Sequence, residues 1–203
     1  RSVKNPLYYT KPGTRSGALV TDTEVRETGK KDYDRYIASD ATLRALKASD
    51  AFTGRVLDFG SGVGRVTEYL LADFADVHGI DISKTMIAEA RKRVPQATFT
   101  HFDGYVLPYG ENNFDVIFSY QVLQYAPRTS DVGNYLKEFY RTLKPGGVAK
   151  VQLRGGRGLK KWEWMYGVPF TPEEAVLLAE EYGFEVLDHQ VEGIKNIWLT
   201  LRK

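Results

Sequence analysis

Hydrophobic and polar positions alternate along this chain with two different spacings from Arg55 onward. Short apolar or β-branched runs are separated by amphipathic stretches, which is typical of strand and helix units wound into a parallel sheet. The runs predict seven strands, at 55–59, 76–80, 97–102, 114–119, 148–153, 184–190 and 196–201. The amphipathic stretches predict helices at 64–74, 84–94, 130–143 and 172–182, the last opening on Thr171-Pro172-Glu173-Glu174.

Two connections sharpen the topology. Lys144-Pro145-Gly146-Gly147 predicts a helix stop and a turn. Only residues 191–195 separate the last two strands, which is too short for a crossover helix, so these strands should pair as an antiparallel hairpin. The pattern therefore predicts an α/β fold with a seven-stranded, mostly parallel sheet, helices on both faces and an antiparallel C-terminal hairpin.

Residues 1–50 follow a different pattern. They are rich in Thr, Gly, Lys and Tyr up to Lys31, and helical patterns follow at 32–37 and 42–48. We expect a lid or collar here, and one domain over residues 51–203. Tyr33 or Tyr36 would either close over a ligand or form the packing face of a helix.

Composition narrows the class of protein. The chain has 203 residues, 42% of them hydrophobic and 27% charged, as expected for a globular protein with its own core. It contains no cysteine, which excludes disulfides, thiolate metal sites and a cysteine nucleophile. A net charge of +2 gives no global field toward nucleic acid or an anionic membrane. No apolar run reaches membrane-spanning length, so we expect a cytoplasmic protein.

A glycine-rich loop is the strongest candidate for a ligand site. Residues 56–64, Val-Leu-Asp-Phe-Gly-Ser-Gly-Val-Gly, run from a strand through a turn into a predicted helix. Glycines permit positive φ and close approach of a ligand, and a helix N-terminus offers free N–H groups to an anionic or polar group. Taken alone, the same loop is also compatible with a simple tight connection.

Three acids lie at the carboxyl ends of three successive predicted strands. Asp58 lies beside the glycine loop, where a carboxylate repels a pyrophosphate but satisfies an ammonium group or the loop's own N–H donors. Asp81 can accept hydrogen bonds from ribose hydroxyls, or can cap the next helix if Ser83 does not. Asp103 can accept from an adenine amine or form an ordinary Asp-Gly turn. Ligands of open α/β sheets bind at this edge, so the three acids together favour a nucleoside-like ligand.

These residues resemble the class I S-adenosylmethionine-dependent methyltransferases, and segments 79–87 and 114–124 resemble their bacterial small-molecule branch. The motifs that match are Asp58 to Gly64, Asp81, Asp103-Gly104 and Leu143 to Gly147. The resemblance implies a Rossmann-like fold, S-adenosyl-L-methionine as cofactor and S-adenosyl-L-homocysteine as product. It implies contacts to the methionine part from Gly60, Ser61 and Gly62, to the ribose from Asp81, to the adenine from Ile82, Met86, Asp103 and Gly104, and near the sulfonium from Ser119 and Tyr120. Met86 is equally well explained as a buried helix residue.

The sequence identifies residues for the methyl acceptor less specifically than residues for the cofactor. A sulfonium is already a strong electrophile, so positioning matters more than a dedicated base. Candidates are Gln121 and Tyr125, together with Gln124, after the fourth strand, and Tyr125 stands where many relatives carry His. Arg154 opens a basic, aromatic loop over 154–166, which suits an anionic or aromatic small molecule or is simply a solvated loop. The three histidines are far apart in sequence, so no metal site is predicted.

Two other functions compete with a small-molecule methyltransferase that acts on O or N. One is methylation of a protein or nucleic acid, which normally needs an added recognition domain or a basic face. The fourth strand also lacks the Pro-Pro-aromatic pattern associated with methylation of adenine or glutamine amino groups. The other is a non-catalytic protein that senses S-adenosylmethionine. Oligomeric state is not predicted by the sequence.

Overall fold

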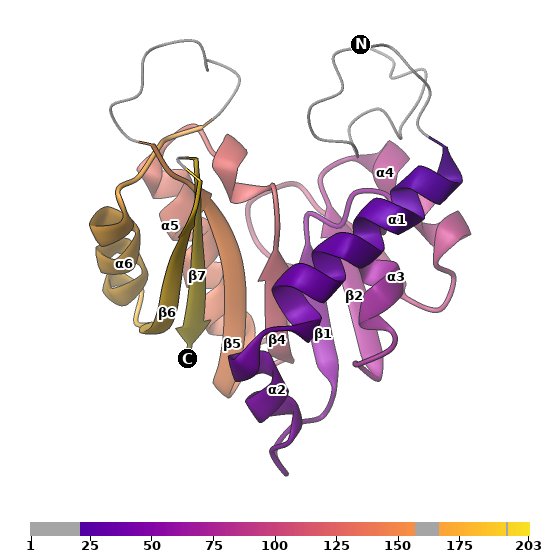
Figure 1. The fold of residues 1–203 in the computed structure, drawn as a ribbon, viewed down its shortest axis with the longest axis horizontal. Helices are drawn as coiled ribbons and strands as arrows, with labels where there is room; N and C mark the ends of the chain where they lie inside the picture. Colours follow the sequence, from indigo (N-terminus) through magenta and orange to yellow (C-terminus); the bar gives the residue numbers. More distant parts are fainter. Residues whose placement is uncertain (1–20, 157–166, 194) are drawn as a thin grey trace. The chain divides into compact units, whose positions relative to one another are not determined.

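A computed structural model describes residues 21–156, 167–193 and 195–203 of the chain (Figure 1). Within these residues seven strands form one sheet with the order β3-β2-β1-β4-β5-β7-β6. The strands are β1 (Arg55–Phe59), β2 (Asp76–Asp81), β3 (Thr98–His101), β4 (Phe114–Ser119), β5 (Leu143–Arg154), β6 (Glu185–Glu192) and β7 (Asn196–Arg202). The predicted fold class is confirmed, and every predicted strand is present.

The helices of the described residues connect and flank these strands. They are α1 (Asp22–Tyr33), the π-helical turn η2 (Asp34–Ala38), α2 (Ala41–Lys47), α3 (Thr67–Leu70), α4 (Lys84–Arg93), the short 3-10 turn η3 (Leu123–Tyr125), α5 (Thr129–Thr142) and α6 (Pro172–Glu181). The α6 start signal is confirmed, because the Thr171 hydroxyl accepts from the Glu174 N–H and the Glu174 carboxylate accepts from the Thr171 N–H.

Three predictions about local structure are wrong. Helix α3 spans four residues rather than 64–74, because Gly64 has a φ of +78°, which a right-handed helix does not accept. Helix α1 lies in a segment from which no helix was predicted before residue 32. Residues 144–147 do not separate a helix from the next strand but fall inside β5.

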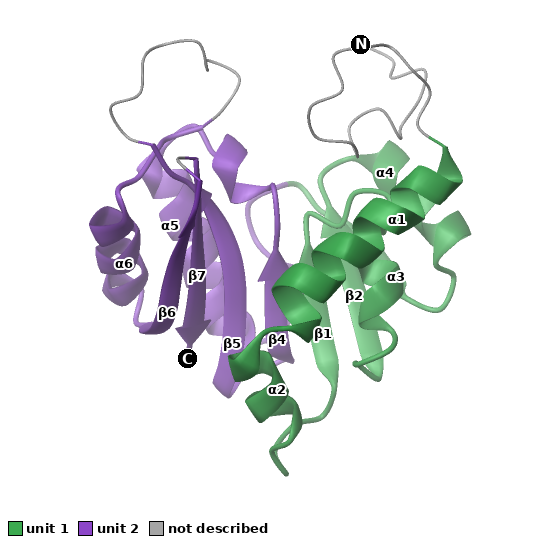
Figure 2. Ribbon diagram, viewed as in Figure 1, with its two compact units in different colours: residues 1–103 green, residues 104–203 purple. Residues whose placement is uncertain are grey.

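The chain divides into two compact units, residues 1–103 and residues 104–203 (Figure 2). In the first unit β1, β2 and β3 pair in parallel, with Phe59 opposite Ile80 and Asp81 opposite His101. This register brings the ends of the three strands, and the polar residues that follow them, to the same edge. A small apolar cluster from α4 and β3, containing Ile87, Ala90, Val94 and Phe99, fixes α4 to the sheet.

Helix α1 is held to the first unit at several points along its length. Gly29 is so close to the segment after the glycine loop that a Cβ there would overlap the Arg65 carbonyl. Val25 packs on Val63, and Met86 packs against both. Ion pairs add to this apolar contact, and they join Asp22 to Arg93, Arg26 to Glu68, and Asp32 to Arg65. The helix therefore fastens directly to the residues that follow the glycine loop.

The second unit contains β4, β5, β7 and β6. Strands β4 and β5 pair in parallel, and β7 pairs antiparallel with both β5 and β6, so the predicted C-terminal hairpin is confirmed. Phe114 lies opposite Leu143 and Val116 opposite Val148, so residues 144–147 form a large bulge in the β4–β5 ladder, although Gly146 and Gly147 bond to Lys203 directly after β7. Gly146 takes a φ of +77° in this bulge, which explains why the sequence reads as a turn.

Candidate functional site

The glycine loop after β1 is bonded to the end of β2. The N–H groups of Gly60 and Ser61 both donate to the Ile80 carbonyl, at 2.8 and 3.0 Å, and the Gly62 N–H donates to Asp81 Oδ2 at 3.0 Å. These three amides are therefore satisfied by the neighbouring strand. The expectation that a helix N-terminus offers free N–H groups here is not met, since α3 begins only at Thr67.

Gly62 gives this loop an open side. It has a φ of +55°, and a Cβ built on it would meet no atom within 4 Å. A Cβ built on Gly64, by contrast, would lie 3.1–3.2 Å from the side chains of Phe99 and Val94, so the absence of a side chain at Gly64 serves packing. The backbone at Gly62 thus forms a cradle that a ligand can approach to contact distance. The Ser61 hydroxyl lies on the opposite, buried side near Gly79, and its oxygen makes no hydrogen bond within the described residues.

Asp81 ends β2 next to this cradle. Its Oδ1 accepts from the Ser83 N–H at 2.8 Å, while Oδ2 accepts from Gly62. Ser83, rather than Asp81, caps α4, because its hydroxyl accepts from the Met86 N–H. Burial raises the pKa of Asp81 above its ordinary value, although the backbone N–H groups of Ser83 and Gly62 act in the opposite direction. Because Ser83 is the residue that caps α4, the alternative of Asp81 as the helix cap is excluded.

Asp58 is buried, and its partner lies on α3. Its Oδ2 accepts from the Thr67 hydroxyl at 2.6 Å. Burial raises the pKa of Asp58 to about 6, and the bonds from Thr67 limit that rise. Asp58 therefore joins β1 to α3 across the glycine loop. Any contact of this carboxylate with an ammonium group would add to the bond from Thr67 or replace it.

The remaining candidates of the first unit differ in exposure. Ile82, directly after Asp81, exposes 65% of its surface, which is high for a large apolar residue. Met86 is half-buried and packs on Val25 and Val63, so part of it belongs to the contact with α1. Asp103 is exposed after β3. The structure thus leaves apolar and acidic side chains accessible at the strand ends of this unit.

In the second unit, the candidates cluster around the end of β4. The Ser119 side chain is fully buried, and its hydroxyl makes no hydrogen bond within the described residues. Tyr120 is half-buried and stacks on Trp198 with ring centroids 5.4 Å apart. Gln121 donates from Nε2 to the Tyr120 hydroxyl at 3.2 Å. Gly104 lies at the start of this unit with a φ of +92°, and its carbonyl accepts from the Tyr135 hydroxyl.

Arg154 and Tyr125 lie near the segment that returns to α6. Arg154 ends β5, and its Nη1 donates to the Gly167 carbonyl. The Gly167 N–H in turn donates to the Gln124 carbonyl at 2.7 Å. Tyr125 exposes 52% of its surface at the end of η3. The bond to Gly167 shows that Arg154 ties together the two ends of the predicted basic loop, of which residues 157–166 lie outside the described residues.

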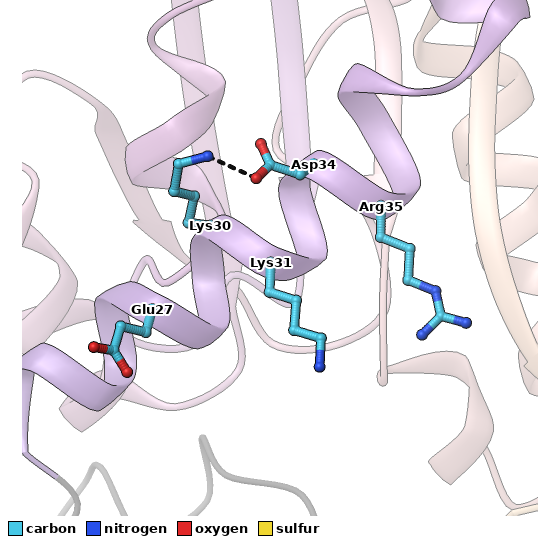
Figure 3. Close-up of a pocket in the computed structure, with 5 residues that line it drawn as sticks. All are labelled: Glu27, Lys30, Lys31, Asp34 and Arg35. Carbon is cyan, nitrogen blue, oxygen red and sulfur yellow. Dashed lines mark hydrogen bonds and ion pairs between the residues drawn. The ribbon is translucent and has the colours of Figure 1, made fainter.

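Other features of the described residues do not add to this site. A shallow hollow on α1 and η2 is lined by charged residues, and Lys30 pairs there with Asp34 at 2.6 Å (Figure 3). The lining residues are Glu27, Lys30, Lys31, Asp34 and Arg35, and none of them is a predicted site residue. No group of three or more His, Asp or Glu side chains with metal-binding geometry occurs in the described part of the chain.

The three histidines lie on different strands. His78 is buried and lies 2.9 Å from Asp76, and burial lowers its pKa, while His101 and His189 are exposed on other strands. None of the helices drawn from the described residues is long and apolar enough to cross a bilayer.

Sequence reasoning missed two residues that support this site. Thr67 holds the Asp58 carboxylate, and Gln152 accepts the Gln121 N–H through its Oε1 at 2.9 Å. A polar Gln in the middle of a strand predicted to be buried was the available signal, because buried polar groups need partners. Thr67 gave no signal, since nothing in its spacing links it to Asp58.

Comparisons with known proteins point to one family. A family model described as a methyltransferase domain matches residues 57–151. The chain is 37% identical over 118 residues to a trans-aconitate 2-methyltransferase of Methylobacterium nodulans, covering 57% of this chain and 43% of that protein. It is 32% identical over 115 residues to a malonyl-acyl-carrier-protein O-methyltransferase of Halorhodospira halophila, covering 54% of this chain and 38% of that protein. The chain therefore spans less than half the length of these two relatives.

Solved structures agree on the fold. An S-adenosylmethionine-dependent methyltransferase from Clostridium acetobutylicum superposes with a TM-score of 0.67 at 16% identity, covering 87% of this chain and 98% of that one. At this identity the likeness concerns the fold. The matched family segment contains the glycine loop, Asp81, Asp103 and the end of β4.

Proposed function

We propose that this chain, which matches a methyltransferase-domain model over residues 57–151, is a class I S-adenosylmethionine-dependent methyltransferase of the bacterial small-molecule type and transfers a methyl group from S-adenosyl-L-methionine to a small-molecule acceptor. The observation that carries this proposal is the cradle at Gly62 beside Asp81. An open backbone at positive φ and an adjacent carboxylate fit the polar methionine part and the ribose of that cofactor.

The proposed contacts follow the resemblance, modified by the geometry. The backbone of Gly60 to Gly62 would face the methionine part, with Ser61 contributing its backbone, because its hydroxyl points toward Gly79. Asp81 would accept from the ribose, and its present donors would have to share it or give it up. The adenine would meet Ile82, Met86, Asp103 and Gly104, and the sulfonium would lie near Ser119 and Tyr120. Asp58 would support the loop through Thr67.

S-adenosylmethionine supplies an electrophilic methyl group, so the protein has to orient the acceptor and exclude water. Tyr120 is suited to this role because its ring is fixed by stacking on Trp198. Gln121 and Tyr125 offer an amide and a phenol that can hold an acceptor. Arg154 would orient an anionic acceptor through its guanidinium group, which also donates to the Gly167 carbonyl.

The acceptor class is a small molecule, and we favour an anionic one. Two relatives act on trans-aconitate and on a malonyl-acyl-carrier protein. Aconitate and malonate are both carboxylic acids, and a carboxylate needs little help from a base in order to accept a methyl group. Methylation at oxygen or nitrogen, an aromatic acceptor, a lid formed by residues 1–50 and the cytoplasmic location stay predictions from the sequence.

Calorimetry with S-adenosylmethionine tests the cofactor site. Replacing Asp81 with Ala should weaken binding by about 1.5–3 kcal/mol, because charged hydrogen bonds to the ribose are lost. Asp81→Asn removes the charge but keeps one acceptor oxygen, so it retains only one of the two bonds from Gly62 and Ser83, and Asp50→Ala removes an exposed carboxylate as a control. Unchanged affinity in both Asp81 variants would contradict the assignment.

Turnover needs a separate experiment. The chain would be incubated with S-adenosylmethionine labelled on its methyl group and a panel of small carboxylic acids, phenols and amines. Incorporation into a carboxylic acid supports the proposal and its favoured acceptor class. Tight cofactor binding without incorporation into any class would favour a sensor of S-adenosylmethionine instead.

A further inference from the structure

Gln121 has an unusual backbone conformation. Its φ is +58°, in the left-handed region, where the Cβ of a residue other than glycine crowds the carbonyl. This conformation costs roughly 1–2 kcal/mol for such a residue. Asn112 is the other non-glycine residue with positive φ in the described part of the chain, and asparagine accepts this region more easily than glutamine. Some contact must therefore hold Gln121 in place.

That contact comes from the side chain of Gln152. Its Oε1 accepts the backbone N–H of Gln121 at 2.9 Å. Ser119 and Val151 form the last residue pair between β4 and β5, so Gln152 reaches the chain immediately after the ladder ends. Gln152 exposes only 1% of its surface, and β5 lies between two paired strands. A rigid, buried acceptor thus takes the place of a backbone partner.

The turn also fixes an aromatic side chain. Gln121 Nε2 donates to the Tyr120 hydroxyl, and Tyr120 stacks on Trp198 with an interplanar angle of 21°. Trp198 is the residue opposite Gln152 in the β5–β7 register. These four residues, Tyr120, Gln121, Gln152 and Trp198, form a connected group that we call the turn clamp.

We propose that Gln152 is a positioning residue, which holds Gln121 in its left-handed conformation and thereby orients Tyr120 and Gln121 toward the acceptor. Its link to methyl transfer rests on the proposed function. The conformational part does not, because the clamp consists of contacts that exist without cofactor or acceptor. The sequence alone does not single out Gln152, whereas the structure shows that its side chain bonds the Gln121 backbone.

Hydrogen exchange measured by NMR tests the clamp directly. In the unaltered chain the Gln121 amide should exchange at least about tenfold more slowly than an unprotected amide. Gln152→Met keeps the length of the side chain but removes the acceptor, so exchange at Gln121 should accelerate about tenfold. Gln152→Glu keeps an acceptor oxygen and should preserve the protection. Thr200→Val, a buried polar change on β7, serves as the matched control and should leave Gln121 unchanged.

A second readout follows the aromatic pair. The chain has three tryptophans, so Trp162→Phe and Trp164→Phe together leave Trp198 as the single reporter. The near-ultraviolet circular dichroism of the Tyr120–Trp198 stack should weaken in Gln152→Met and persist in Gln152→Glu. Adding Gln121→Gly to Gln152→Met should restore the stack signal in part, because glycine adopts positive φ without the Cβ penalty.

The outcomes separate the two proposals. An unprotected Gln121 amide in the unaltered chain overturns the clamp even if Gln152→Met fails to fold, and so does equal exchange in a folded Gln152→Met variant. The amide of Gln121 can lose its protection in Gln152→Met while the unaltered chain fails to bind S-adenosylmethionine. That result would refute the proposed function but support the clamp. Once an acceptor is known, Gln152→Met should lower kcat or raise the acceptor KM, and Gln152→Glu should preserve both values.

Discussion

Asp58 shows at the scale of one residue how a buried acid couples stability to pH. Burial raises its pKa from 3.8 to about 6 in the folded chain. The folded state therefore holds a proton that the unfolded state has already released over this interval. The resulting stability is fully present below pH 3.8 and is lost as the pH rises through about 6.

Asp58→Asn should remove this dependence while keeping an acceptor for the Thr67 hydroxyl. The free energy of unfolding of the unaltered chain should fall relative to the variant, by up to about 3 kcal/mol between pH 4 and 7. Urea unfolding at several pH values measures the difference, and Asp50→Asn controls for the loss of an exposed charge. A constant difference across this pH range would show that Asp58 does not titrate as described.

The residues of the site were predictable to different degrees. Asp81 was identifiable because it follows a predicted strand, where a carboxylate either binds a ligand or caps the next helix. Ser83 was predicted as the competing cap. The bond from Gly62 to Asp81 was not predictable, since it depends on how closely the loop approaches β2. Gln121 gave no sign of its positive φ, because that conformation is imposed by a residue 31 positions away.

At the scale of an element, α1 depends on the close approach of Gly29 to the chain after the glycine loop. Gly29→Ala should destabilise the fold by about 1–3 kcal/mol, because a Cβ would collide with the Arg65 carbonyl. Helix propensity alone predicts a gain of about 1 kcal/mol for the same change. Urea unfolding shows whether the free energy of unfolding falls or rises in Gly29→Ala. Lys31→Ala, on the exposed side of α1, is the control.

Helix α1 also illustrates why some elements escaped prediction. Its buried face consists of Val25, Gly29 and Tyr33 alone, a stripe one residue wide and too sparse to give a clear period. A capping box at Thr21 and Glu24 was the missed signal. The strands were easier to predict than α1, because continuous, mostly apolar runs such as 114–119 are buried at every position.

At the scale of the whole molecule, cofactor binding should appear as thermal stabilisation. S-adenosylmethionine at 100 times its dissociation constant adds about 2.7 kcal/mol to the free energy of unfolding. For a chain of 203 residues this corresponds to a rise in Tm of roughly 5–10 °C. Differential scanning fluorimetry measures it, with NAD at the same concentration as the comparison. A shift with NAD alone would contradict the cofactor assignment.

The fold class was predictable from the sequence, whereas the order of the strands in the parallel part of the sheet was not predicted. The hairpin of β6 and β7 followed from the short segment between them. The bulge at residues 144–147 did not, since a Pro-Gly-Gly run indicates a turn whether the chain reverses or merely leaves the ladder. Local chemistry thus predicts where the chain bends but not what it pairs with afterwards.

The hairpin places β6 last in the strand order, where one side of the strand has no neighbour in the described sheet. Glu185 and Asp188 are exposed there, and the register shifts between Val186 and Asp188. A strand from another molecule would meet carboxylates and an interrupted ladder instead of a continuous row of partners. We therefore expect the irregular, acidic β6 to disfavour edge-to-edge aggregation in concentrated solutions of this protein.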